Sequence, residues 1–377
     1  MIIQEPATLT TQDGASFPAT LHHDADKPRR TAFVMMHPSS DWQQQFLLGL
    51  LAAHGFGALG CANRYAGREA ELLLEHTLLD WAACVDHLHA MGYSKVVGIG
   101  YSGGGEIATG YQSESVMPTI KGTCMGDPPD LTCARLTPMD GIVMFNAHAG
   151  RPHSVTLALD PSVGGESGND PLKYDASLDM FNPRNGPPFS EEFRALYRAA
   201  QAERNHKITR WCQGMLKSIR SAGNPLMTDF PFIVHRTDAN LHFLDAPAKA
   251  DAAGKKESTR WGLDARTANY TPGPLRGNST RLMIVTHASW LSQRSLATSQ
   301  FDVMRFMPQC RVPTLVVWGT ADASGSAQSR KIFDLSPDPG KTFVAVEGAT
   351  HFMRGQTELQ AAVADHICAW ARERGLD

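Results

Sequence analysis

Residues 95–106 constrain the fold more than any other stretch of the sequence. An apolar run, residues 95–101, is typical of a buried strand and leads into a serine, Ser102, that is set among glycines. A strand, a sharp turn and the start of a helix would present the Ser102 hydroxyl at the carboxyl end of the strand. Gly100 and Gly104 suit such a turn because they have no Cβ atom to crowd it. The stretch therefore predicts a nucleophile presented by an α/β scaffold.

The same residues also match a dinucleotide-binding pattern. Residues 98–103 spell G-x-G-x-x-G after a strand, and neither this pattern nor G-x-S-x-G is specific by itself. The dinucleotide pattern predicts an acidic residue at the end of the next strand, about 20 residues on, where this chain has the proline-rich residues 125–130. It also usually follows the first strand of a domain, whereas residues 95–101 form an interior one. The sequence therefore favours the nucleophile.

The composition of the 377 residues is that of a soluble globular protein, with 42% hydrophobic and 19% charged residues. A net charge of −3 gives no electrostatic reason to expect nucleic acid or an anionic membrane as a partner, so a small-molecule substrate is expected. The first residues lack the features of a secretory signal, and no apolar run reaches the roughly 18 residues of a membrane span. We therefore expect a cytoplasmic enzyme. The oligomeric state stays open, a homodimer included.

Metal binding and disulfide bonds are not expected from the seven cysteines and fifteen histidines. The cysteines are odd in number, scattered along the chain and free of C-x-x-C spacing, and the histidine pairs lack further ligands at metal spacing. Whether Cys124 and Cys133 pair is the one question left open. No metal or organic cofactor is predicted.

Strands and helices alternate in the two flanking parts of the chain, which predicts an α/β fold with a mainly parallel sheet and helices on both faces. An antiparallel hairpin opens the chain, with its turn at Asp13-Gly14. We expect strands near residues 5–11, 15–22, 31–37, 57–62, 95–101, 140–146, 311–319 and 343–347. Helices are expected near 46–54, 74–88, 325–335 and 359–370, and a further helix begins at Gly103.

The alternation breaks for roughly 160 residues, far more than the usual connection of 2–6 residues. We interpret residues 149–310 as a large, mostly helical cap inserted between a first core part, residues 1–148, and a second, residues 311–377. Aromatic and methionine side chains of the cap are candidates for an apolar substrate pocket, with packing inside the cap as the alternative. They are Trp211, Met215, Trp261, Trp290, Phe301 and Phe306.

Groups able to carry out chemistry follow the predicted strands. In an open α/β sheet the functional groups gather at the carboxyl ends of the strands, and Ser102, Asp322 and His351 each lie at such an end. A serine hydroxyl needs a neutral imidazole to accept its proton, and a carboxylate fixes the tautomer of that imidazole. The three residues therefore predict nucleophilic catalysis by Ser102, with His351 as base and Asp322 as its partner.

An oxyanion intermediate would also need two hydrogen-bond donors. The Gly103 amide, at the start of the predicted helix, is one candidate. The loop after the strand at residues 31–37 is expected to supply the other, and because Pro38 has no N–H, the Ser39 amide is the better choice.

This order of motifs resembles the α/β-hydrolase superfamily. The match consists of strand-G-x-S-x-G-helix, then W-G-x-x-D at residues 318–322, then G-x-x-H at residues 348–351, and it covers about residues 5–148 and 311–376. The resemblance implies an eight-stranded sheet, a Ser102–His351–Asp322 triad and a cap after the sixth strand. The sequence departs from the family at His37-Pro38, where His-Gly is usual. A serine at position 102 differs from the carboxylate nucleophile of dehalogenases and epoxide hydrolases.

The resulting prediction is a serine hydrolase that cleaves a carboxylic ester of a small or medium apolar molecule through an acyl-enzyme. A thioester, lactone, amide or carbon–carbon bond would use the same triad. A nicotinamide-dinucleotide-binding reductase or a non-catalytic binding protein is the alternative of another class.

Four further residues are candidates for substrate binding. Arg64, after the strand at residues 57–62, could bind a substrate carboxylate, although structural pairing is common for arginines. Trp42 and Tyr101 could shape the floor of the pocket, with a place in the core as the alternative. His148 follows the strand at residues 140–146 and could line the pocket.

Overall fold

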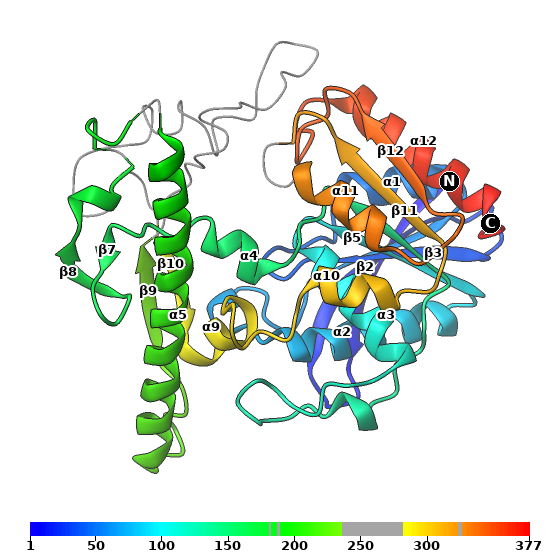
Figure 1. Cartoon of the computed structure of the whole chain (residues 1–377). Helices are drawn as coiled ribbons and strands as arrows, with labels where there is room; N and C mark the ends of the chain where they lie inside the picture. Colours follow the sequence, from blue (N-terminus) through cyan, green and yellow to red (C-terminus); the bar gives the residue numbers. More distant parts are fainter. Residues whose placement is uncertain (181, 187–188, 236–281, 323–325) are drawn as a thin grey trace. The chain divides into compact units, whose positions relative to one another are not determined.

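The computed structural model describes the chain except for residues 181, 187–188, 236–281 and 323–325 (Figure 1). Its backbone contacts divide it into two compact units. The first unit combines Met1–Gly150 with Phe301–Asp377, and the second unit is Arg151–Gln300. The chain thus leaves the first unit after the strand that ends at Phe145 and returns to it at Phe301.

The first unit is built on an eight-stranded sheet with the order β1-β2-β4-β3-β5-β6-β11-β12. β1 and β2 form an antiparallel hairpin, β2 pairs antiparallel with β4, and the six strands from β4 to β12 run parallel to one another. The predicted α/β class with a mainly parallel sheet is confirmed. The strands are β1 (Ile2–Thr10), β2 (Ser16–Asp24), β3 (Thr31–Met36), β4 (Gly57–Cys61), β5 (Lys95–Tyr101), β6 (Gly141–Phe145), β11 (Thr314–Gly319) and β12 (Thr342–Val346).

Helices cover both faces of this sheet (Figure 1). They are α1 (Phe46–Ala53), α2 (Leu74–Ala90), α3 (Gly104–Val116), α10 (Val303–Phe306), α11 (Ser326–Leu335) and α12 (Thr357–Glu373), with short 3₁₀ turns η1 (Glu69–Glu71), η2 (Leu131–Cys133) and η5 (Met307–Gln309). Strand side chains alternate between two cores because successive residues of a strand point to opposite faces. In β3, Val34 and Met36 join the core under α2, α3 and α10, whereas Phe33 and Met35 join the core under α1 and α12.

The second unit is organised around one long helix, α5 (Glu191–Ser221). Ser190 caps this helix by accepting a hydrogen bond from the Phe193 amide. Its core includes Trp290, whose indole N–H donates to Thr209 Oγ1 at 3.1 Å. The other elements are α4 (Arg151–Thr156), the β7 (Val163–Gly164) and β8 (Asp170–Tyr174) pair, η3 (Ala176–Leu178), the β9 (Pro231–His235) and β10 (Leu282–Thr286) pair, and α9 (His287–Gln293).

The return to the first unit comes ten residues earlier than the sequence analysis placed it. Phe301 and Phe306 are buried in the core of the first unit, with ring centroids 5.8 Å apart, and both lie against Gly110 of α3. These two residues therefore belong to the sheet-bearing unit and not to an insertion pocket. Their apolar character fills the core beside α3 before β11 begins, so the next strand was a poor marker for the boundary.

The other predicted pocket residues have different outcomes. Trp290 is fully buried within the second unit, which fits packing, and Trp211 packs edge-on against Phe232 with ring centroids 4.9 Å apart. Met215 is half-buried on α5, and Trp261 lies outside the described residues. Cys124 and Cys133 are both free thiols.

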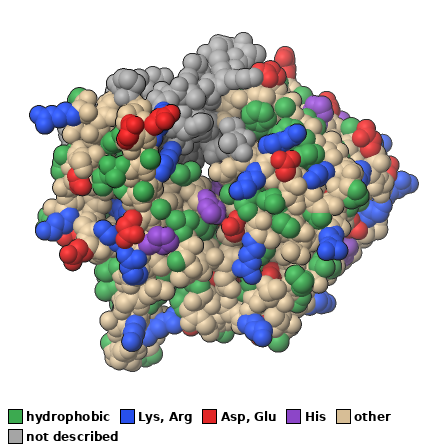
Figure 2. Space-filling view, viewed as in Figure 1, with side chains coloured by type: hydrophobic (Ala, Val, Ile, Leu, Met, Phe, Trp, Pro, Cys, Tyr) green, Lys and Arg blue, Asp and Glu red, His purple; other side chains and the backbone are tan. Residues whose placement is uncertain are grey.

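Two surface properties bear on the sequence analysis. On the face drawn in Figure 2, basic and acidic side chains are interspersed, in line with the nearly balanced charge of the sequence. Among the described residues, no helix combines the length and apolar character that crossing a membrane requires.

Candidate active site

Ser102 lies at the sharp turn between β5 and α3. Its backbone has φ = 53°, a left-handed conformation that is uncommon for a residue with a side chain. The Ser102 amide donates to Phe145 O at the end of β6, and the Gly105 amide donates to Ser102 O at the first turn of α3. These hydrogen bonds hold the strained residue in place. The strand–turn–helix geometry predicted for residues 95–106 is therefore present.

Two glycines are required by the tight packing of this turn. A Cβ atom at Gly104 would lie 2.6 Å from Met36 O at the end of β3. A Cβ atom at Gly100 would lie 2.7 Å from the Cα atom of Gly105. Both distances are shorter than normal contacts, so any larger residue would push α3 away from the sheet. Helix α3 can therefore begin directly behind Ser102.

The three residues predicted to form a triad are in contact. His351 Nε2 lies 2.9 Å from Ser102 Oγ, and His351 Nδ1 lies 3.1 Å from Asp322 Oδ1. His351 and Asp322 are each about 1% exposed, and they follow β12 and β11 respectively. Because Asp322 accepts a hydrogen bond from the Nδ1 proton, the neutral imidazole presents an unprotonated Nε2 to the serine hydroxyl. This arrangement can withdraw a proton from Ser102.

The loop after β3 does not place the Ser39 amide as predicted. The Ser39 N–H donates to Nδ1 of His37 at 3.1 Å, so this amide is committed within its own loop. The His37 ring stacks on Trp42, with centroids 4.9 Å apart and planes inclined by 2°. Asn63, which follows β4, fixes the loop by donating to the carbonyl oxygens of His37 and Pro38. The predicted role of Ser39 is therefore corrected: its amide orients the His37 ring.

Solved structures with similar folds share little sequence with this chain. The hypothetical protein PA2218 from Pseudomonas aeruginosa has a TM-score of 0.55 at 15% identity, with 99% of this chain and 94% of that chain covered. DcsB, solved as a complex with its substrate analogue, has a TM-score of 0.54 at 14% identity, with 99% of both chains covered. The α/β hydrolase GrgF from Penicillium sp. sh18 has a TM-score of 0.52 at 9% identity, again with 99% of both chains covered. This chain has the α/β-hydrolase fold. No protein-family model and no curated protein matches its sequence.

Within this α/β-hydrolase fold, Tyr101 and Trp42 belong to the core. Tyr101 is fully buried, and its hydroxyl donates to the carbonyl oxygen of His351. Trp42 is 6% exposed and packs edge-on against Tyr101, with ring centroids 5.0 Å apart. The prediction that these rings form the floor of the pocket is corrected, since both support the site from behind: Tyr101 holds the His351 backbone and Trp42 holds the His37 ring.

Arg64 is also corrected, because two carboxylates of this chain occupy its guanidinium. Its Nε donates to Asp80 Oδ1 at 2.6 Å, and its terminal nitrogens bind both carboxylate oxygens of Asp13 at 2.6 and 2.9 Å. Asp80 is fully buried, and burial raises its pKa to about 6 even though Arg64 opposes this rise. Arg64 therefore ties the hairpin turn and α2 to the end of β4.

Two polar residues, His148 and Asn146, follow β6. His148, predicted to line the pocket, is half-buried in the loop after β6, and its role stays a prediction. Asn146, which the sequence analysis did not single out, donates to the carbonyl oxygen of His351 and accepts from the Gly319 amide. Its sequence signal was weak: a polar side chain that closes an otherwise apolar strand.

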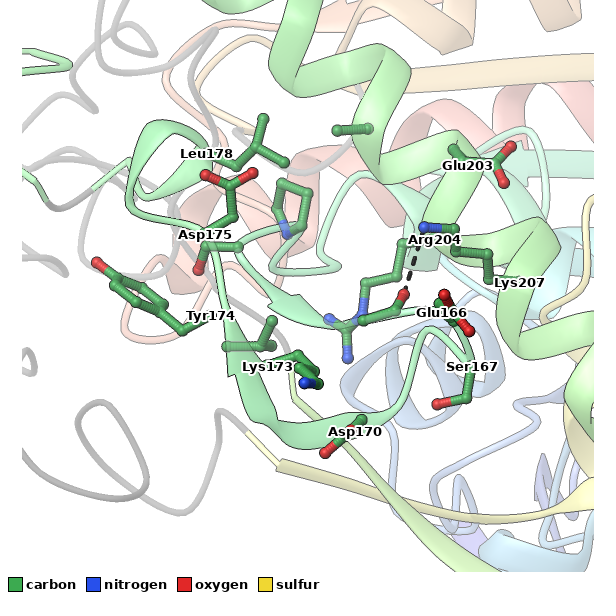
Figure 3. A pocket seen from close by; sticks show the side chains of 15 residues that line it. Glu166, Ser167, Asp170, Lys173, Tyr174, Asp175, Leu178, Glu203, Arg204 and Lys207 are labelled. Carbon is green, nitrogen blue, oxygen red and sulfur yellow. Dashed lines mark hydrogen bonds between the residues drawn. The ribbon is translucent and has the colours of Figure 1, made fainter.

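A separate cavity of about 870 Å³ lies within the second unit, between the β7–β8 region and α5 (Figure 3). Arg204, buried on α5, donates hydrogen bonds to the carbonyl oxygens of Asp160, Gly168 and His235, and so joins three segments of this unit. Lysine and acidic side chains both line the cavity, and none of the sequence-predicted site residues does. Among the described residues, no cluster of histidine, cysteine or acidic side chains is suited to hold a metal ion.

Proposed function

We propose that this protein is a serine hydrolase that cleaves a carboxylic ester of a small or medium apolar molecule. The observation that carries the proposal is the chain of two hydrogen bonds from Ser102 Oγ through the His351 ring to Asp322. The left-handed turn at Ser102, at the carboxyl end of β5, adds further support. A buried serine with only a structural role would have no need of a buried imidazole–carboxylate pair behind it.

The proposed reaction follows from the roles of these three side chains. Ser102 Oγ attacks the ester carbonyl carbon while His351 Nε2 accepts the hydroxyl proton, and Asp322 stabilises the imidazolium that results. When the tetrahedral intermediate collapses, the carbon–oxygen bond to the alcohol breaks and the alcohol takes the proton from His351. Water then attacks the acyl-enzyme, with His351 as base, and the carboxylic acid leaves. The sequence of steps requires no metal or organic cofactor.

The negative oxygen of the intermediate needs hydrogen-bond donors. We assign one to the Gly103 amide, because Gly103 is the N-cap residue of α3 and follows the nucleophile directly. We assign the second to the His37 ring in place of the Ser39 amide. Since His37 Nδ1 accepts the Ser39 N–H, the proton of the neutral ring is on Nε2. A Cβ atom built on Gly103 would lie 3.1 Å from this Nε2, which brings the donor beside the nucleophile turn.

Covalent labelling tests the proposal most directly. The wild-type protein should react with a fluorophosphonate probe at Ser102, and the Ser102→Ala and His351→Ala variants should not. Ser94, at the opposite end of β5, provides the matched control: its hydroxyl donates to Arg30 O, and Ser94→Ala should label like the wild type. An unlabelled wild type, or equal labelling of Ser102→Ala, would overturn the serine hydrolase and favour the reductase or a binding protein.

The bond that is cleaved requires a second measurement. Rates on p-nitrophenyl esters of increasing acyl length should pass through an optimum at a small or medium acyl chain, because the pocket has a finite size. Matched thioester, lactone and amide substrates should be cleaved more slowly than the best ester. If one of these, or a substrate with a hydrolysable carbon–carbon bond, is the better substrate, the triad stands and the ester assignment fails.

A further inference from the structure

The end of β6 joins all three loops that carry the triad. Phe145 O accepts the Ser102 amide at 3.1 Å, which holds the nucleophile turn. The next residue, Asn146, donates its backbone N–H to Val317 O of β11 at 3.0 Å. Its side chain then makes two further hydrogen bonds, one toward the loop of Asp322 and one toward the loop of His351. No local sequence pattern would reveal such a junction.

The side-chain amide of Asn146 makes these two bonds with opposite polarity. Its Oδ1 accepts from the Gly319 amide at 2.8 Å, and its Nδ2 donates to the carbonyl oxygen of His351 at 3.2 Å. Only an amide side chain of this length offers an acceptor and a donor side by side. Asn146 also has φ = 42°, a conformation that asparagine adopts more readily than most residues. Both the backbone conformation and the pair of side-chain hydrogen bonds therefore favour asparagine at this position.

Asn146 is linked to the acid through a single residue, Gly319. Gly319 donates its N–H to Asn146, and its carbonyl oxygen accepts the amide of Asp322 at 3.0 Å. On the other side, the carbonyl oxygen of His351 receives a second hydrogen bond from the Tyr101 hydroxyl. Asn146 is 1% exposed, so water does not compete for these bonds. The loops that carry the acid and the base are already joined by backbone hydrogen bonds, such as the one from the Ala321 amide to Ala349 O at 3.0 Å. The buried side chain of Asn146 adds a link that acts on the carbonyl oxygen of His351 itself.

We propose that Asn146 is a positioning residue that sets the alignment of the His351 ring between Ser102 and Asp322. This inference rests on the proposed hydrolase function. If Asn146 loses its donor, the carbonyl oxygen of His351 keeps the hydrogen bond from Tyr101 but loses the one from Asn146, and the imidazole can shift relative to the serine hydroxyl. Displacements of about 1 Å in a reacting group can cost about 100-fold in rate. The loss should fall on the chemical step and not on substrate binding.

Two variants separate the parts of this role. Asn146→Gly keeps the left-handed backbone and removes the side chain, whereas Asn146→Asp keeps the shape and the acceptor but removes the donor to His351. Each should lower kcat on a short p-nitrophenyl ester by about 10- to 100-fold, with KM changed less than about twofold. The rate of fluorophosphonate labelling should fall in parallel.

The chain offers a matched control in Asn205, another fully buried asparagine, which lies in the second unit. Its Oδ1 accepts the Leu296 amide at 3.0 Å, and its Nδ2 donates to Arg294 O and Thr156 Oγ1 at 2.8 Å. Asn205→Asp should therefore reduce thermal stability about as much as Asn146→Asp, while its labelling rate per folded molecule stays at the wild-type value. A purely structural role should thus lower only the thermal stability, whereas mispositioning of His351 should lower both the thermal stability and the labelling rate per folded molecule.

Tyr101→Phe keeps the test decisive if the Asn146 variants do not fold. It removes only the second donor to the same His351 carbonyl oxygen and should lower kcat in the same direction, by about 3- to 10-fold. The inference would be overturned if the folded Asn146 variants had wild-type kcat and labelling rates. If the Asn146 variants do not fold, wild-type kcat and labelling rates in Tyr101→Phe would overturn it. A wild type that does not label at Ser102 would overturn the proposed function first, so the two failures are distinguishable.

Discussion

Replacement of Arg64 by methionine tests whether this arginine holds the fold or binds a substrate carboxylate. Methionine keeps much of the apolar stem and removes the guanidinium that pairs with Asp80 and Asp13. Asp80 is fully buried, so its carboxylate would lose its cation without gaining water. We expect Arg64→Met to lower the free energy of unfolding by about 3 kcal/mol at pH 8, the range for breaking a buried ion pair.

The loss should depend on pH, and its sign follows from the pKa of Asp80. Burial raises this pKa to about 6 from 3.8, so the native state binds more protons than the unfolded state between these values, and stability falls as pH rises through this window. Without the guanidinium, burial is still opposed by the backbone N–H of residue 64, but the pKa should rise further, toward the value of about 8 that fully buried carboxyl groups can reach. The fall in stability then continues to pH 8 in the variant, whereas it ends near pH 6 in the wild type.

This difference gives a magnitude that can be measured. Between pH 5 and pH 8, the free energy of unfolding should fall by about 2 kcal/mol more in the variant than in the wild type, since each pKa unit corresponds to about 1.4 kcal/mol. Urea unfolding followed by tryptophan fluorescence at both pH values would measure it. The pKa of Asp13 is about 2, which lies below this range, so its titration does not interfere.

Two controls isolate Asp80 and the substrate. In an Asp80→Asn background, Arg64→Met should lose its pH-dependent part, because the titrating carboxyl group is absent. KM for an ester that carries a carboxylate should change by the same factor as KM for its neutral analogue. An equal loss of stability at pH 5 and pH 8 would refute the ion-pair argument. A selective rise in KM for the carboxylate ester would restore the substrate-binding role.

Three further substitutions test the site. Asp322→Asn should lower kcat on a p-nitrophenyl ester by about 10⁴-fold with little change in melting temperature, because the imidazole loses its tautomer control. His37→Phe should keep the stack on Trp42 and lower kcat by about 100-fold with KM nearly unchanged, because the Nε2 donor is lost together with the Nδ1 acceptor of the Ser39 amide. Gly104→Ala should slow labelling of Ser102 and cost about 1–3 kcal/mol of stability, because its Cβ atom would lie 2.6 Å from Met36 O.

Each of these substitutions has a control in the same chain. Asp334→Asn changes an exposed carboxylate on α11 and should leave kcat unchanged. Ser39→Ala keeps the amide that orients His37, so it should behave like the wild type. Full activity in His37→Phe would show that another group donates the hydrogen bond to the oxyanion. Gly49→Ala, on α1, adds a Cβ atom with no neighbour within 4 Å and should not reduce stability. Equal effects of the two alanines would contradict the steric argument at Gly104.

Local patterns in the sequence determined the sheet and pointed to the three residues of the proposed triad. Apolar runs and helical spacing predicted the strands and the covering helices, because burial on one or both faces leaves a short period in the sequence. The turn at Ser102 was predictable for the same reason, since its glycines are neighbours in the chain. Asp322 and His351 followed from the rule that functional groups gather at the carboxyl ends of parallel strands.

Only the tertiary structure decided what the remaining residues do, because their partners lie far away in the chain. Arg64 binds Asp13 and Asp80, Tyr101 reaches His351, and Asn146 bridges Gly319 and His351, and no periodicity records such pairs. The Ser39 amide could be counted as an available donor from sequence, but its orientation toward His37 could not. Sequence alone thus predicted the three residues proposed to react, while folding determined which side chains hold them in place.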